Sequence, residues 1–147
     1  MIAATGAGRT AFVQSISHLV DLGLLERNPG HGHPLRPEFR LTRDGLAAGD
    51  MAAHVLTIGQ EDGAPDLLRR MWTIPVLAVC QEPRYFSDIR TDLAPVTDRA
   101  LSQTLKNLHA RNWLQRNTDA SLHPPRPAYM ATNAGVAIGR AAQVLTR

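Results

Sequence analysis

Polar side chains that can hydrogen-bond to DNA bases gather on one face of the segment 97–110. Leu101, Leu105 and Leu108 recur there at i, i+4 and i+7, a spacing that predicts a helix with one apolar, inward face. Gln and Asn can pair bidentately with adenine and Arg or Lys with guanine, and any of them can hold a phosphate. Thr97 is placed to cap the helix. The residues left outward or flanking are Arg99, Ser102, Gln103, Lys106 and Asn107.

A solvated helix face is the alternative explanation, and for an isolated amphipathic helix it would be favoured. The neighbouring elements reverse that preference. A short apolar strand, Trp113-Leu114, follows the helix, and a loop rich in Pro and Asn leads to a returning strand at 129–131. Thr132 then begins a closing helix. Helix, strand, loop, strand and helix in this order are typical of the second part of a winged-helix unit.

The segment before this helix can supply the rest of such a unit. Residues 66–81 are largely helical in pattern, and Pro75 either kinks one helix or lies in the first turn of a new helix that runs to Gln81. A short helix is expected over 86–93. Three helices and a wing make a complete unit of about 80 residues. The apolar residues expected on one face of the first segment are Leu67, Met71 and Ile74.

Four runs of this region carry a family resemblance. They are Trp72-Thr-Ile-Pro-Val-Leu77, Phe86-Ser-Asp-Ile-Arg90, Leu101-Ser-Gln-Thr-Leu-Lys-Asn-Leu108 and Pro124-Pro-Arg-Pro-Ala-Tyr129. From about Leu68 to Val144 the chain resembles the HxlR family of bacterial winged-helix transcriptional regulators. The resemblance implies a homodimer that binds operator DNA. Pro75 departs from the family pattern, in which an aliphatic residue is usual.

The chain also contains an internal repeat. With an offset of 89 residues, 12–19 aligns with 101–108 and 24–28 with 113–117. With an offset of 90, 34–39 aligns with 124–129. The repeat predicts a tandem winged helix-turn-helix, mainly α with small β-hairpin wings in an α+β arrangement. Beyond the wings, Thr42, Gly45, Ala47 and Gly49 fall on Thr132, Gly135, Ala137 and Gly139.

The two predicted copies are unequal. Residues 1–59 form an incomplete winged-helix unit with a recognition-type helix, a wing and a closing helix; 60–65 form a linker, and 66–147 form the complete unit. Gly8 is the counterpart of Thr97, so the first copy lacks counterparts of the opening helices. Either the chain is a truncated product or a partner supplies the missing surface.

Charge is divided in the same uneven way. Residues 1–66 carry five basic and eight acidic side chains, a net charge of −3, whereas 67–147 carry eleven and five, a net charge of +6. A basic half suits contact with phosphates, and an acidic first half suits a protein-interaction module. The helix face of the first copy, with only Arg9 as a basic residue nearby, is a poorer DNA reader and suits a packing or dimer surface. Further DNA-binding candidates in the second copy are Arg84 and Ser87, with His123 and Arg126 on the wing. Secondary candidates in the first copy are Arg9, Gln14, Ser17, His18 and Arg36.

Other chemistry finds little support. Cys80 lies among apolar residues and is expected to be a buried, inert thiol. His31 and His33 stand in a glycine-rich wing without a Cys or carboxylate at ligand spacing, so no metal site is expected. No nucleophile motif or singled-out carboxylate pair suggests an enzyme, and we expect no cofactor. A single cysteine, with no signal peptide and no apolar run long enough to span a bilayer, predicts a cytoplasmic protein.

The sequence therefore predicts a DNA-binding transcriptional regulator. The 97–110 helix would enter the major groove of double-stranded DNA, and the 117–129 wing would lie on the backbone. We expect a homo-oligomer, with a dimer favoured, and no membrane association. The alternative is a protein–protein interaction module built on winged-helix units without direct DNA readout.

Overall fold

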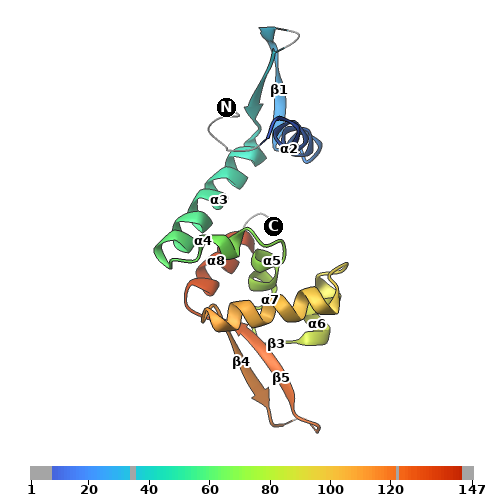
Figure 1. Ribbon diagram of the computed structural model, residues 1–147, viewed down its shortest axis with the longest axis vertical. Coiled ribbons are helices and arrows are strands. Elements are labelled where there is room, and N and C mark those ends of the chain that lie inside the picture. Colours follow the sequence, from blue (N-terminus) through green and yellow to red (C-terminus); the bar gives the residue numbers. More distant parts are fainter. Residues whose placement is uncertain (1–7, 34–35, 122, 144–147) are drawn as a thin grey trace. The chain divides into compact units, whose positions relative to one another are not determined.

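A computed structural model describes residues 8–33, 36–121 and 123–143, without the side chains of residues 30–33 and 36 (Figure 1). The chain divides into two compact units, Met1–Asp50 and Met51–Arg147. Helix α3, Arg43–Glu61, begins in the first unit and ends in the second. Within the described residues, every helix is too short or too polar to cross a lipid bilayer.

The first unit is a helix followed by a β-hairpin and the start of α3. Helix α2 spans Arg9–Asp21, and strands β1, Leu25–His33, and β2, Arg36–Leu41, pair antiparallel. The pairing sets Leu25 opposite Leu41 and is irregular between Arg27 and Gly32. The helix predicted from the apolar spacing is present, yet none of its residues is buried.

A turn with left-handed backbone joins α2 to β1. Gly23 has φ +70°, and the Leu24 amide donates to the Leu19 carbonyl at 2.9 Å. Thr42 closes the unit from the other end of the hairpin: its hydroxyl donates to the Gly23 carbonyl at 2.6 Å and its amide donates to the Leu24 carbonyl at 3.1 Å. Gly45 lies so close to Leu24 that a Cβ there would overlap the Leu24 carbonyl oxygen. Hydrogen bonds, rather than a buried core, fix this unit locally.

The second unit has a winged-helix-like α/β fold. Its three-stranded antiparallel sheet has the order β3-β5-β4. In Figure 1 the β4–β5 hairpin extends away from the helices of this unit. The elements are α4 Pro65–Leu68, α5 Thr73–Val79, β3 Arg84–Tyr85, α6 Phe86–Asp92, α7 Asp98–Ala110, β4 Leu114–Asp119, β5 Arg126–Ala131 and α8 Ala134–Gln143.

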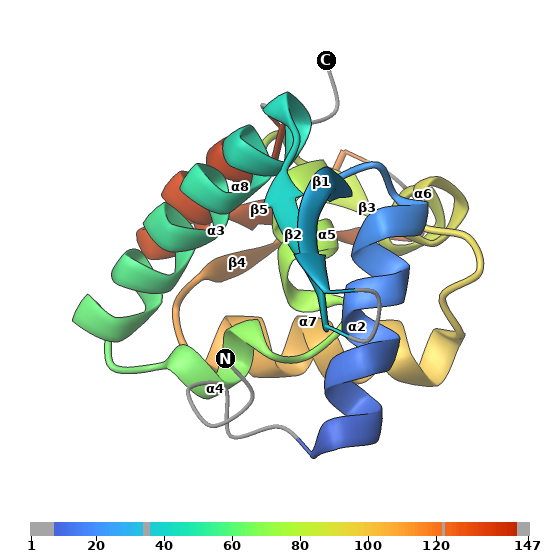
Figure 2. The same cartoon turned by 90° about the horizontal axis from the view of Figure 1, so that it is seen from above.

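Helix α5 is the centre of the core of this unit. It packs against both α7 and α8, as Figure 2 shows. A Cβ on Gly139 of α8 would overlap the Leu77 carbonyl oxygen, so the missing side chain lets α8 approach α5 closely. Each fully buried Leu, Ile or Val contributes about 1.5–3 kcal/mol relative to an exposed one. Side chains without measurable exposure include those of Val76, Leu77, Leu101, Leu108, Trp113 and Ile138.

The segment before α5 differs from the sequence prediction. Residues 69–72 turn between α4 and α5, so 66–81 is not one helix. Met71 lies in this turn, 78% exposed, and does not share a helix face with Leu67 and Ile74. Pro75 lies in the first turn of α5, where its missing amide hydrogen has no helical partner to lose. This is one of the two arrangements that the sequence allowed. The new helix ends at Val79, before Gln81.

The second half of α3 is part of the second unit. Val55 is 2% exposed in its core, and α3 continues to Glu61, into the segment 60–65 that the sequence marked as a linker. Asp62 accepts hydrogen bonds from the Trp113 indole nitrogen at 2.6 Å and from Arg111 Nε at 3.0 Å. The division between the units accordingly falls between Asp50 and Met51, because the residues after it pack on the second core.

Candidate nucleic-acid interface

Helix α7 is anchored at its start and along one face. The Thr97 hydroxyl accepts a hydrogen bond from the Ala100 amide at 3.2 Å, which confirms Thr97 as the N-cap. Leu101, Leu105 and Leu108 are at most 3% exposed, which confirms the predicted inward face. Thr104 is buried beside them, and its hydroxyl donates to the Ala100 carbonyl at 2.8 Å.

The opposite face of α7 carries the candidate base-reading residues. Gln103 Nε2 donates to Asn107 Oδ1 at 2.9 Å, so the two amide groups hold one another one turn apart. This pair leaves the Gln103 oxygen and the Asn107 nitrogen for other partners, an acceptor and a donor suited to a base edge. Asn107 is half-buried. The exposed residues of the face are Arg99, Ser102, Gln103 and Lys106.

Arg84 and Ser87 lie at the start of α6 in different environments. Arg84 is half-buried and forms an ion pair with Asp92, and its Nε is buried without a hydrogen-bond partner. Its positive charge is therefore partly neutralised by Asp92 within the unit. Ser87 is exposed in the first turn of α6, and its hydroxyl donates to Asp88 Oδ1 at 3.3 Å. Of the two, Ser87 is the more accessible to a phosphate.

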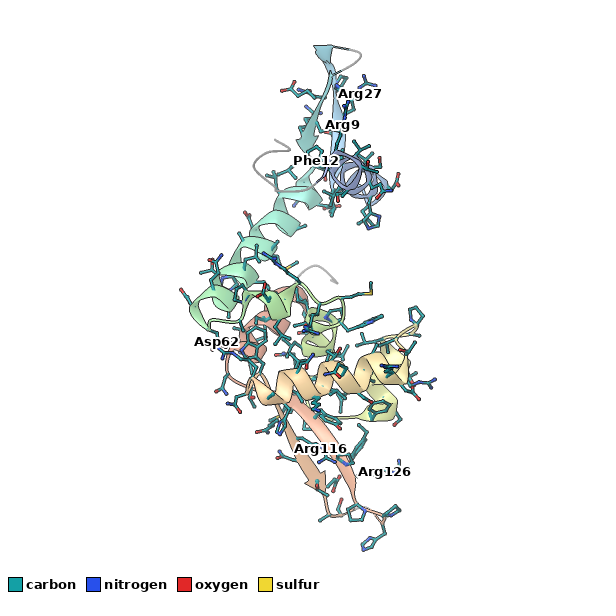
Figure 3. All side chains as sticks on the ribbon, in the orientation of Figure 1. Arg9, Phe12, Arg27, Asp62, Arg116 and Arg126 are labelled. Carbon is teal, nitrogen blue, oxygen red and sulfur yellow. The ribbon has the colours of Figure 1, made fainter. Side chains whose placement is uncertain are left out.

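The wing is the β4–β5 hairpin, and it is tied to the start of α6. The Tyr85 hydroxyl donates to Asp119 Oδ2 at 2.6 Å. This hydrogen bond raises the pKa of Tyr85, while hydrogen bonds from Ser121 and Tyr85 lower the pKa of Asp119. Both shifts keep the neutral phenol and the carboxylate in place at neutral pH. His123 is exposed beyond this tether, and Arg126 is exposed opposite Asp119 on β5 (Figure 3).

Basic side chains around α7 divide into paired and unpaired groups. Arg90 pairs with Asp98, and Arg111 pairs with Asp62. In the part of the chain that the structure describes, no carboxylate forms an ion pair with the remaining basic residues near α7 and the wing. These are Arg99, Lys106, Arg116 and Arg126.

Arg116 and His109 were not singled out from the sequence. Arg116 is exposed on β4, directly opposite Tyr129 of β5. His109 is exposed on α7, and its Nδ1 lies 3.1 Å from the Leu114 carbonyl oxygen. The spacing of Lys106 and His109 at i and i+3 was a usable signal, since residues three apart share a helix face. The position of Arg116 depends on strand register, which the sequence does not specify.

The secondary candidates gather on α2 of the first unit. Arg9, Gln14, Ser17 and His18 are all exposed on this helix, and Figure 3 labels Arg9 near its start. The Arg36 side chain lies outside the described residues, as do those of His31 and His33. The structure brings four of the five candidates together on one helix.

The described residues offer little for thiol or metal chemistry. The Cys80 thiol is buried without measurable exposure, and this burial raises its pKa to about 12. Such a thiol is a poor nucleophile. Among the residues with described side chains, no group of three or more His, Cys, Asp or Glu could hold a metal ion.

Comparison with protein families gives a match over the second unit. The family described as "HxlR-like helix-turn-helix" matches residues 67–147, more than half of the chain. The matched region runs from α4 through α8 and therefore includes α7 and the whole wing. No curated protein matches the chain.

Several solved structures are similar to parts of the chain. A MarR-family transcriptional regulator from Porphyromonas gingivalis W83 is 15% identical with a TM-score of 0.49, covering 55% of this chain and 79% of that chain. The reduced form of the transcriptional regulator YodB from B. subtilis is 22% identical with a TM-score of 0.48, covering 55% and 79%. A MarR-family regulator from Enterococcus faecalis V583 is 18% identical with a TM-score of 0.48, covering 73% and 86%. All three TM-scores lie below 0.5.

Proposed function

Because the chain belongs to the HxlR-like helix-turn-helix family, we propose that it is a transcriptional regulator that reads double-stranded DNA with α7. In this proposal α7 enters the major groove and the 117–129 wing lies along the backbone. The observation that carries it is the two-sided character of α7. Its apolar face is buried in the core, and its polar face carries exposed side chains, among them Lys106, which forms no ion pair with the described residues.

The side chains would divide between base reading and backbone contact. Gln103 and Asn107 suit the donor and acceptor pattern of adenine, because their mutual hydrogen bond orients both amides. Lys106 and Arg99 suit guanine or phosphate, and Ser102 suits phosphate. Ser87, His123 and Arg126 would add phosphate or minor-groove contacts. Arg84 is the weakest of the candidates, because Asp92 already neutralises it.

The tandem arrangement is the second part of the proposal. Similar hydrogen bonds in the two units support it. The Thr132 hydroxyl donates to the Asn112 carbonyl and the Thr132 amide to the Trp113 carbonyl, at 3.0 Å each. Thr42 makes the same two bonds to the carbonyls of Gly23 and Leu24. Asn112 also has a positive φ, 60°, at the position equivalent to Gly23. We therefore regard the first unit as an incomplete winged helix and the second as the complete, DNA-reading one. Arg9 and Gln14 would have a minor role in DNA binding.

Two copies of α7 are needed for a long operator. A dimer that places them about 34 Å apart on one face would fit consecutive major grooves of B-DNA. Dimer formation is part of this proposal and follows from the pattern of the family.

A protein-interaction module remains the second candidate, and one observation favours it. Val13, Leu22 and Leu46 in the first unit are each more than half exposed. Exposed apolar side chains of this size mark contact surfaces more often when they cluster. In that interpretation a protein partner would cover these side chains of the first unit, and α7 would not read DNA.

Selection of bound fragments from genomic DNA by the purified full chain tests the proposal. We expect enrichment of a defined sequence, with affinity that falls steeply as salt rises because several Lys and Arg groups displace counterions. Absence of sequence enrichment, with only weak non-specific binding, would contradict DNA reading and favour the interaction module.

A further inference from the structure

A small hollow lies between α7, the start of α6 and the wing. Its volume is about 250 Å³, and it opens on the same side of α7 as Ser102 and Lys106. The hollow belongs wholly to the second unit. The base-reading residues Gln103 and Asn107 do not line it, so its own lining residues decide which ligand it can hold.

The floor of the hollow is apolar and mostly aromatic. Phe86 begins α6, Leu105 comes from the buried face of α7, and Tyr129 stands on β5. Leu105 is only 3% exposed, and Phe86 and Tyr129 are half-buried, so the floor is part of the packed unit. Two aromatic rings and a leucine offer the surface that a flat apolar group would cover.

The rim of the hollow carries two cationic side chains and a histidine. Lys106 and His109 stand one turn apart on α7, and Arg116 faces them from β4. Among the described residues, neither Lys106 nor Arg116 has a carboxylate partner, whereas Arg90 and Arg111 nearby each have one. No acidic side chain lines the hollow. An apolar floor beneath unpaired cations favours a ligand that joins a ring to a negative charge.

We propose that this hollow is a binding site for a small aromatic carboxylate. The ring would lie on Phe86, Leu105 and Tyr129, and the carboxylate would accept hydrogen bonds from Arg116 and Lys106. The planar guanidinium suits a bidentate contact with a carboxylate, and the ammonium adds a second charge-assisted bond. A hollow of 250 Å³ fits a single substituted ring better than a larger ligand.

The site would regulate DNA binding, and this consequence rests on the proposed function. Lys106 and Ser102 line the hollow and also belong to the proposed DNA-reading face. A carboxylate held by Lys106 removes that cation from the duplex and adds a negative charge beside the phosphates. The ligand and DNA therefore compete, and each lowers the affinity of the protein for the other by the same factor.

Ligand binding is tested first in the absence of DNA. The full chain is titrated with benzoate, with benzamide as the uncharged ring, and with inorganic phosphate as the anion without a ring, while amide NMR signals are followed. We expect saturable shifts with benzoate at residues around the hollow, and at least about tenfold weaker binding of the other two probes, because each lacks half of the recognition. Equal binding of benzamide or phosphate, or no binding of benzoate, overturns the site.

Variants locate the site and separate it from the proposed function. Arg116→Gln should weaken benzoate binding about tenfold. Arg140→Gln should leave it unchanged, because Arg140 is exposed on α8 and does not line the hollow. Equal losses in both variants would show general charge attraction and overturn the site. With DNA selected as described above, benzoate should weaken DNA binding by wild type more than by Arg116→Gln. Benzoate binding without any effect on DNA overturns the competition alone, and a lack of DNA binding overturns the proposed function while leaving the ligand site intact.

Discussion

The helix–hairpin–helix of the first unit and that of the second, α7–β4–β5–α8, have the same order of elements but not the same burial. No residue of α2 is buried, whereas four residues of α7 are. Both helices have apolar residues at i, i+4 and i+7. The difference comes from α5, which covers α7 and α8 in the second unit. An apolar stripe therefore predicts a helix, but its burial requires a second layer.

The two units also differ in how many large hydrophobic side chains they expose. Among the residues whose side chains are described, five of the seven exposed large hydrophobic side chains precede Asp50. Gly49 shows the same effect on a small scale, because a Cβ there would meet nothing within 4 Å, whereas the aligned Gly139 is tightly enclosed. The second unit thus holds a closed core, and the first holds its shape through turns and hairpin pairing.

The largest expected difference between the units is the loss of unfolding free energy when an apolar side chain on the inner face of α7 or α2 is shortened to alanine. Leu105→Ala should lower the free energy of unfolding of the second unit by about 2–5 kcal/mol, because it leaves a cavity beneath α7. The aligned change, Ile16→Ala, should cost well under half as much, since Ile16 is only half-buried. Both tryptophans, Trp72 and Trp113, lie in the second unit, so their fluorescence during urea unfolding measures the effect of Leu105→Ala, and amide hydrogen exchange along α2 measures the effect of Ile16→Ala. A similar loss at Ile16 would show that α2 has a closed core after all.

Adding one methyl group at the aligned glycines gives the next largest contrast. Gly139→Ala should destabilise the second unit by about 1–3 kcal/mol, because its Cβ would overlap the Leu77 carbonyl and the Gln81 amide. Gly49→Ala has open space around the new Cβ and should stabilise α3 by up to about 1 kcal/mol through helix propensity. Thermal unfolding followed by circular dichroism measures both variants. A destabilising Gly49→Ala would indicate that a tightly packed neighbour covers this position in solution.

The smallest contrast concerns the starts of the two helices. Thr97→Ala should cost about 1 kcal/mol, because it removes the hydrogen bond to the Ala100 amide. Gly8, the N-cap of α2, makes no side-chain cap, and Gly8→Thr should gain only a few tenths of a kcal/mol. Amide hydrogen exchange in the first turn of each helix is the suitable measurement. Unchanged exchange in Thr97→Ala would show that the Thr97 cap does not stabilise the first turn of α7.

Much of the second unit could be predicted from the sequence. The stripe of Leu101, Leu105 and Leu108 and the cap at Thr97 indicated α7, since both depend on local spacing. Pro75 was correctly limited to two positions, a kink or a first turn. The prediction of one helix face shared by Leu67, Met71 and Ile74 was wrong, because the helical spacing continues across residues 69–72, where the chain turns between α4 and α5. Local periodicity does not reveal such a break unless a proline or glycine stands at it.

The candidate site was only partly predictable. Helical spacing was enough to place Gln103 and Lys106 on an outward face. The ion pair that occupies Arg84 depends on Asp92 at the far end of α6, and the hollow beside Arg116 depends on the register of β4 with β5. Such tertiary relations bring together residues whose spacing in the sequence carries no signal.

The most direct test of the asymmetric account compares DNA binding by two double variants. Gln103→Ala with Lys106→Ala removes the centre of the α7 face, and Arg9→Ala with Gln14→Ala removes the aligned glutamine and the one arginine of α2. With the selected DNA, the first pair should lose at least about tenfold in affinity and reduce the slope of log affinity against log salt by about one. The second pair should change affinity by less than about twofold. Equal losses from both pairs would contradict the claim that the second unit is the DNA reader.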